Sequence, residues 1–288
     1  MIFEHITAVI DHTLHFSLKK GAVNFINSHY QVQTAGFINL VMFNIKDQAT
    51  WPIYDEMIDL SVVYLIVISG FHLSIFKQTI FKIFKHHHQL TYVISFCFLL
   101  LYCYFLNFAV SVTRVMLSLL ITWIFKRFHF SRFDVLGLSG MLTILLAPSV
   151  AFNIGFCLSY LCTGVILMVY GMKINNLLVE KLTINLSATL VGLPFVLMMN
   201  ERISIWVIIN SFVLAYVFVF IFIYFLLTFW IIWIFPVHNM IVNIVLHIVT
   251  WSWNTNVTLE IKPWIAIINV LYYYTYFFPI MIVIYKRS

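Results

Sequence analysis

Long apolar runs separated by short polar segments dominate this chain from about residue 60 onward. Several of them approach the roughly 20 apolar residues that a helix needs to cross the hydrocarbon core of a bilayer. The pattern predicts an all-α, polytopic helical membrane protein. The runs cover about 60–76, 90–109, 111–125, 134–151, 153–171, 184–199, 237–251 and 264–284.

One further run, 203–235, is too long for a single simple crossing. As a continuous helix it would extend about 50 Å, whereas the hydrocarbon core is roughly 30 Å thick. It is either two shorter segments divided near Asn210–Ser211 or one strongly tilted helix. Both alternatives stay open at this stage.

The first 59 residues differ from the remainder, because their apolar patches, such as "AGFINLVMFNI", are too short to cross a bilayer. Trp51 and Tyr54 suit the level of the lipid headgroups. We interpret 1–59 as an amphipathic or interfacial helical segment that leads into a membrane part at 60–288.

Composition agrees with a membrane protein, since only 9% of the residues are charged and 63% are hydrophobic. Soluble domains carry roughly 25% charged residues. The basic residues gather in three segments, 77–85, 126–132 and 173–181, and each segment is separated from the next by two predicted spans. Cytoplasmic loops are enriched in Lys and Arg, so these three segments are predicted to share the cytoplasmic side.

The sequence predicts no metal site, disulfide or cofactor. All four cysteines lie inside apolar runs without zinc-site spacing, and buried free cysteine behaves as a small hydrophobe. His86, His87 and His88 follow one another in a basic segment. Three consecutive residues of a helix cannot converge on one ion, so a solvated loop is the better interpretation.

Polar residues interrupt the first predicted span, "YLIVISGFHLSIF", at Ser69, Gly70 and His72. Ser69 and His72 are three residues apart and would face the same side of a helix. A Ser–His nucleophile is one interpretation, but no third orienting group accompanies the pair. We therefore expect no enzymatic activity, and packing by small residues is the simpler alternative for Ser69 and Gly70.

Arg114 lies inside another apolar run, and an ionisable residue within the membrane is by default a functional-site hypothesis. It either lines a polar path or pairs with Asp134, which opens the next run; the alternative is an arginine that extends to the membrane surface. Pro148, Asn153 and Gly155 interrupt the junction of two later runs. Such breaks leave backbone polar groups without helical hydrogen bonds, and within the membrane these groups must be buried in protein or line a water-filled cavity. We therefore expect broken or re-entrant helices around a polar path.

These segments, in this order, resemble the ComEC competence family. "ISGFH" resembles its ISGLH signature, "SVTRVMLSLLI" its arginine-bearing span, and "FDVLGLSGMLTILLAPSVAFNIGFCLSY" its span led by an aspartate. The resemblance implies an inner-membrane, multi-pass channel through which single-stranded DNA enters the cytoplasm in natural transformation. It implies a lipid bilayer, a cytoplasmic motor ATPase and DNA-receptor proteins as partners, and it is compatible with a homo-oligomer.

Carried over position by position, the resemblance makes eight residues candidates for the DNA path: Ser69, Gly70, His72, Arg114, Asp134, Asn153, Gly155 and Ser159. Pro148, Phe152, Phe156, Leu158, Pro194 and Asn210 also match the family's pattern. Asn153 and Cys157 depart from it, because the family usually has Asp and Gln there. The sequence contains no counterpart of the family's OB-like or nuclease domain, so nuclease activity is not carried over. A small-molecule or ion transporter with a polar path remains the alternative.

Overall fold

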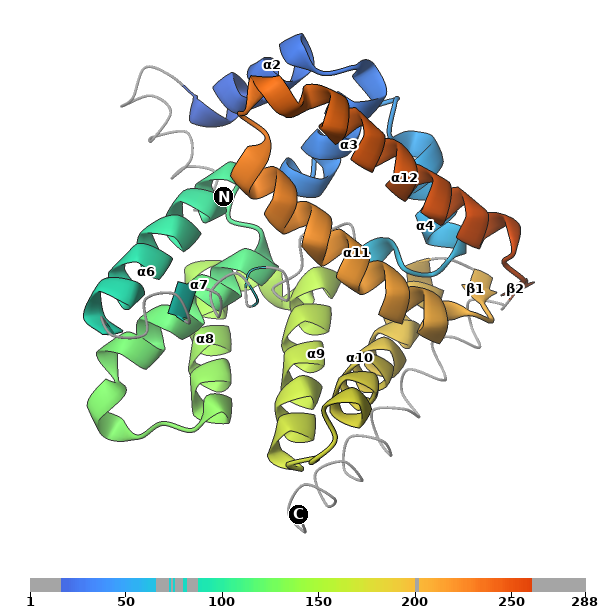
Figure 1. Ribbon diagram of the computed structural model, residues 1–288. Coiled ribbons are helices and arrows are strands. Elements are labelled where there is room, and N and C mark those ends of the chain that lie inside the picture. The colour runs from blue at the N-terminus through green and yellow to red at the C-terminus, as the bar shows by residue number, and fades with distance from the viewer. Residues whose placement is uncertain are drawn as a thin grey trace.

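The computed structural model describes residues 17–65, 73, 75, 80–81, 88–199 and 202–260, and it confirms the all-α class (Figure 1). The helices are α2 (Leu18–His29), α3 (Val32–Phe43), α4 (Trp51–Asp59), α6 (His88–Phe105), α7 (Val110–Ile124), α8 (Arg132–Leu146), α9 (Ile154–Gly171), α10 (Leu177–Met199), α11 (Val207–Thr228) and α12 (Phe235–Asn254). Short 3₁₀ turns are η1 (Val63–Leu65), η2 (Lys126–Phe128), η3 (Pro148–Phe152) and η4 (Ile232–Ile234).

Most of the predicted spans within the described residues are helices. The runs 90–109, 111–125, 153–171 and 237–251 correspond to α6, α7, α9 and α12. The run 134–151 is α8 followed by η3, since Pro148 has no backbone N–H to continue the helix. The run 264–284 and most of 60–76 lie outside the described residues.

The long run 203–235 divides at residues 229–234, not near Asn210–Ser211. Helix α11 passes through both residues without a break, and the Ser211 hydroxyl is satisfied within it by donating to the Ile208 carbonyl at 3.0 Å. Pro236 lies in the first turn of α12, where proline is favoured and the missing N–H costs nothing. The position of the break is therefore set by Pro236, which lies just after it, and not by Asn210 and Ser211.

Four helical stretches among the described residues are long and apolar enough to cross a membrane, and the chain is a membrane protein. They are Ile154–Gly171, Leu177–Phe195, Val207–Thr228 and Ile232–Asn254. Three shorter apolar helices accompany them: α3, most of α6, and α7.

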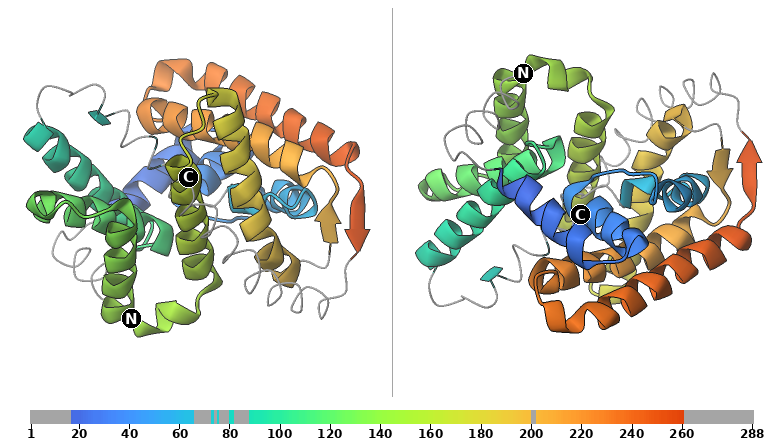
Figure 2. Two further views of the ribbon diagram at one scale, coloured as in Figure 1. Left: turned by 90° about the horizontal axis from the view of Figure 1, so that it is seen from below. Right: turned by 90° about the horizontal axis from the view of Figure 1, so that it is seen from above.

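Helix α3 lies in the core, which differs from the interfacial position expected for this part of the chain. Ten consecutive residues, 34–43, are buried. The helix packs against α2, α11 and α12, and Figure 2 shows the blue N-terminal helices beside the orange ones in both views. The physical reason is that α3 has apolar residues on all sides, and a helix without a polar face is stable only when it is enclosed. Helices α2 and α4 do keep polar faces, since they bury only Ile26 in α2 and Ile53 and Met57 in α4.

A buried tyrosine–histidine contact joins α2 to the turn between α11 and α12. The Tyr30 hydroxyl donates to the Phe229 carbonyl at 2.8 Å and lies 2.7 Å from Nδ1 of His238. His238 has no exposed surface, and its Nε2 lies 3.2 Å from the Thr228 hydroxyl. The ring of Phe235 also packs against Tyr30, with 4.3 Å between the ring centroids. This contact holds the start of the described chain to its last helix.

A two-stranded antiparallel sheet is the one departure from an all-helical structure among the described residues. Strand β1 (Arg202–Ser204) pairs antiparallel with β2 (Thr258–Glu260). The Ser204 N–H donates to the Ser61 hydroxyl at 3.0 Å, and the Asn256 side chain donates to the Asp59 carbonyl at 3.1 Å. This strand pair therefore anchors the end of α4.

The turn between α7 and α8 and the turn between α9 and α10 lie at the same end of the bundle, the lower end in Figure 1. Both turns carry basic residues, and we expect both to face the cytoplasm. Phe130→Cys and Asn175→Cys, each in a chain without its natural cysteines, should react with an impermeant maleimide only after the membrane is opened. Labelling of one position in intact cells and of the other only in opened cells would contradict this orientation.

Candidate functional site

Arg114 is buried between α7 and α9, with 7% of its surface exposed. Its Nε–H donates to the Ser159 hydroxyl at 2.9 Å, and its Nη1 donates to the Thr163 hydroxyl. Ser159 and Thr163 are four residues apart and therefore lie on one face of α9. One guanidinium thus joins α7 to α9 through two hydroxyl groups. This geometry does not fit an arginine that extends to the membrane surface.

No carboxylate among the described residues forms an ion pair with Arg114, and the Tyr160 ring lies 5.9 Å from the guanidinium carbon. Hydroxyl groups satisfy N–H donors but do not neutralise the charge. A positive charge within a membrane bundle is costly, and where it occurs it usually marks a path or a ligand site. Within the part of the chain that the structure describes, the positive charge of Arg114 is therefore not compensated by a carboxylate.

The hydrogen bonds around Arg114 continue from α9 to α8. The Tyr160 hydroxyl lies 3.1 Å from the hydroxyl of Thr143, which in turn donates to the Ser139 carbonyl at 2.7 Å. The two helices approach closely there, because a Cβ added to Gly140 would lie 3.2 Å from the Tyr160 ring. We refer to Arg114, Ser159, Thr163, Tyr160 and Thr143 as the arginine cluster.

A second polar group lies between α10 and α11. The Ser211 hydroxyl accepts from the Asn185 side chain at 3.1 Å and lies 3.0 Å from the Thr189 hydroxyl. The side-chain nitrogen of Asn210 is buried beside Ser211 without a hydrogen-bond partner among the described residues. A buried donor without a partner costs free energy.

Of the eight candidate residues, the structure brings Arg114 and Ser159 into direct contact. Asn153 and Gly155 lie together at the start of α9, where the Asn153 side-chain oxygen accepts from the Gly155 N–H at 2.7 Å. Asn153 is thus the N-cap of α9, an ordinary use of asparagine that satisfies one free backbone donor. Ser69, Gly70 and His72 lie outside the described residues.

Asp134 does not pair with Arg114, so that alternative was wrong. Its side chain is exposed and accepts from the Ser131 N–H at 2.8 Å, while its own N–H donates to the Ser131 hydroxyl at 3.1 Å. This reciprocal pair is a capping box at the start of α8. The Asp134 carboxylate therefore accepts a hydrogen bond within its own helix cap, at the first turn of α8.

We expect Asp134→Ala to lower the free energy of unfolding by about 1 kcal/mol, because the start of α8 loses its cap. Denaturant unfolding of the purified protein, followed by circular dichroism, measures this loss. Ser131→Ala should cost a similar amount, and the double variant little more, because the two side chains form one unit. Unfolding at the wild-type midpoint by both single variants would show that the box contributes nothing.

Sequence reasoning missed Thr163, Tyr160 and Thr143. Two hydroxyl residues four positions apart, Ser159 and Thr163, are a signal of a polar stripe along α9 that the sequence does contain. Nothing local indicates that α7 supplies the guanidinium, since Arg114 lies 45 residues before Ser159.

A family model described as "Competence protein" matches residues 42–287 of this chain. The uncharacterized protein MG316 homolog of Mycoplasma pneumoniae is 30% identical over 189 residues, which are 65% of this chain and 49% of that protein. The uncharacterized protein MG316 of Mycoplasma genitalium is 31% identical over 173 residues, which are 59% of this chain and 46% of that protein. The chain thus spans about half the length of these curated relatives. No solved structure matches it significantly.

Proposed function

This chain belongs to the competence protein family, and from that premise we propose that it conducts single-stranded DNA into the cytoplasm during natural transformation. In this proposal it is a multi-pass protein of the cytoplasmic membrane. Its helices surround the strand, and the protein carries out no covalent chemistry on it.

The observation that carries the proposal is the uncompensated charge of Arg114. Each nucleotide brings one phosphate, so a strand that crosses the membrane needs a positive partner within the bundle. A guanidinium offers a planar fork of N–H donors that matches a phosphate group. Ser159 and Thr163 hold two of these donors, and the others, which have no partner among the described residues, would meet a phosphate.

The remaining candidates have supporting roles in this proposal. Asn153 and Gly155 form the start of α9, one turn before Ser159, and would set the position of the arginine cluster relative to the strand. Ser69, Gly70 and His72 would contribute polar groups from the first predicted span. Asp134 would act indirectly, by fixing the start of α8.

The partners that this function requires are single-stranded DNA, a DNA receptor on the outer side and a motor ATPase on the cytoplasmic side. We assign the motor to the side of the basic turns at 126–131 and 172–176. Basic groups there would hold the phosphates of the emerging strand. A homo-oligomer is compatible with this arrangement.

Deleting the gene and comparing two kinds of uptake tests the proposal. Cells without the protein should lose internalisation of labelled single-stranded DNA and keep the uptake of small metabolites. Normal DNA internalisation combined with loss of an anionic metabolite would instead support a small-molecule transporter, for which the same buried arginine would serve as the anion site.

A further inference from the structure

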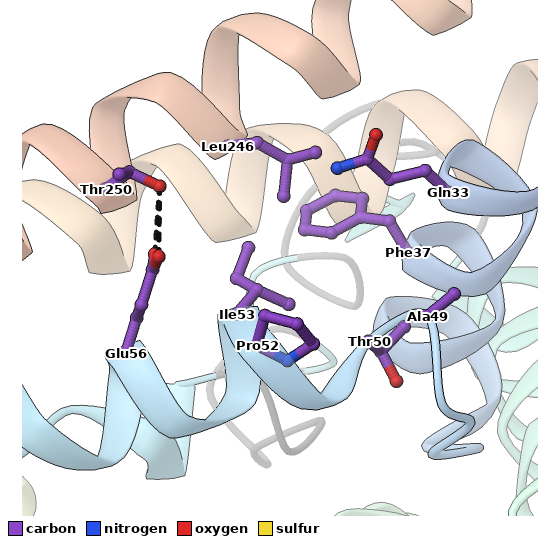
Figure 3. A pocket seen from close by; sticks show the side chains of 9 residues that line it. All are labelled: Gln33, Phe37, Ala49, Thr50, Pro52, Ile53, Glu56, Leu246 and Thr250. Carbon is purple, nitrogen blue, oxygen red and sulfur yellow. Dashed lines mark hydrogen bonds between the residues drawn. The ribbon is translucent and has the colours of Figure 1, made fainter.

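A cavity of about 110 Å³ lies between α3, α4 and α12, away from the arginine cluster (Figure 3). About 10–15 Å³ of such volume suffices for one water molecule, so this cavity has room for a small organic ligand. Figure 3 shows Glu56 at one end, Gln33 at the other, and Phe37 and Leu246 between them. The cavity thus has two polar ends and an apolar middle.

Among the described residues, the Thr250 hydroxyl is the one donor to the carboxylate of Glu56. Its two oxygens lie 3.0 Å and 3.2 Å from the Thr250 hydroxyl, which has a single hydrogen to donate. No basic side chain among the described residues forms an ion pair with it. A half-buried carboxylate prefers several donors or an opposite charge, so Glu56 presents unused acceptor capacity to the cavity.

The neighbouring carboxylate of Asp59 is a useful contrast. It lies one turn further along α4 and accepts from the indole N–H of Trp253 at 3.0 Å. A second hydrogen bond to a carboxylate therefore joins α4 to α12, and it does not border the cavity. Helices α4 and α12 would therefore stay joined through Asp59 if the Glu56 carboxylate bound a ligand.

We propose that this cavity binds a small primary ammonium, with the ammonium group donating to Glu56. Its short carbon chain would lie on Phe37 and Leu246, and a hydroxyl at the far end would meet the Gln33 side chain. Ethanolamine has this arrangement of groups. Ethanolamine exists as a free amine and as a lipid headgroup; in the headgroup its oxygen is esterified to phosphate, which would accept from the Gln33 amide in place of the hydroxyl. Trp51, 58% exposed at the start of α4, suits the level of lipid headgroups.

Ligand-observed NMR on the full chain in phosphatidylcholine nanodiscs tests this inference with ethanolamine as the probe. Ethylene glycol, which replaces the ammonium by a second hydroxyl, is the neutral control. We expect saturation transfer to ethanolamine and none to ethylene glycol at the same concentration. Equal transfer to both, or to neither, would overturn the proposal.

Variants identify the anchor. Glu56→Gln keeps an oxygen for Thr250, and we expect about tenfold weaker ethanolamine binding because the charge-assisted hydrogen bond is lost. Asp55→Asn removes the same charge from an exposed position of the same helix and should bind as the wild type does. Equal weakening in both variants would mean attraction by surface charge only and would overturn the site.

A third variant keeps the test independent of how well Glu56→Gln folds. Thr250→Val leaves the carboxylate in place and should bind ethanolamine within about threefold of wild type, because the removed hydroxyl contributes no charge. Loss of binding in Thr250→Val with retained binding in Glu56→Gln would show that the carboxylate is not the anchor.

Changing the nanodisc lipid distinguishes a lipid headgroup from a free amine as the natural source of the ammonium. If a headgroup fills the cavity, phosphatidylethanolamine nanodiscs should weaken the binding of free ethanolamine by about tenfold through competition. If the natural ligand is a free amine, the affinity should be the same in both lipids. DNA uptake enters neither measurement, so this site and the proposed function can fail independently.

Discussion

Arg114→Leu is expected to abolish DNA internalisation while the amount of protein in the membrane stays near the wild-type level. Leucine removes a charge whose insertion within a span costs about 2.5–3.5 kcal/mol, so insertion should be unchanged or easier. Of the two hydroxyl partners of the arginine, Thr163 keeps a hydrogen bond after the substitution, because it donates to the Ser159 carbonyl at 2.8 Å. The bundle should therefore fold without the charge that the strand requires.

The measurement is the ratio of internalised labelled DNA to protein in the membrane fraction. Arg114→Lys should recover only part of the uptake, because a point charge cannot replace the planar fork of donors. Lys20→Leu removes a positive charge from an exposed position of α2, to which no role in DNA binding is assigned, and should keep most of the uptake. Wild-type uptake by Arg114→Leu would mean that the buried charge is incidental.

His238→Ala is expected to lower the free energy of unfolding by about 3 kcal/mol. The substitution removes the ring from a fully buried site, so it leaves a void and also breaks the contacts to Tyr30 and Thr228. Tyr30→Phe should cost less, about 1 kcal/mol, because it removes a hydroxyl and keeps the ring.

Thermal unfolding of the detergent-solubilised protein measures these losses. His247→Ala, an exposed histidine on the same helix, is the matched control and should unfold close to the wild-type temperature. If His238→Ala and His247→Ala unfold at the same temperature, the histidine contact does not hold α2 to the end of α11.

The helices could be predicted from the sequence because an apolar run in lipid must satisfy its own backbone hydrogen bonds, and a helix does so within one segment. What could not be predicted depends on contacts between distant segments. The arginine cluster joins residues 45 and 49 positions apart, and β1 pairs with a strand more than 50 residues later. Neither pairing leaves a local pattern.

For two features that differ from the expectations, the sequence did contain a signal. The sequence "SRFD" places Ser131 three residues before Asp134, the spacing of a capping box, so the local role of this aspartate was available before any partner was sought. Helix α3 has no polar face in its sequence, which favours burial over the interface. Its neighbours in the core come from α11 and α12, and no local reasoning could have named them.

The enclosed position of α3 has a consequence for how the protein is made. The helix is 12 residues long, too short to span the bilayer, and α11 begins more than 160 residues after it ends. At about 5–20 residues per second, a ribosome needs roughly 10–30 s to supply that partner. Throughout this interval α3 lacks the part of its enclosing surface that α11 and α12 provide. We therefore expect chains whose synthesis stops before α11 to leave part of α3 uncovered and to be degraded by membrane proteases.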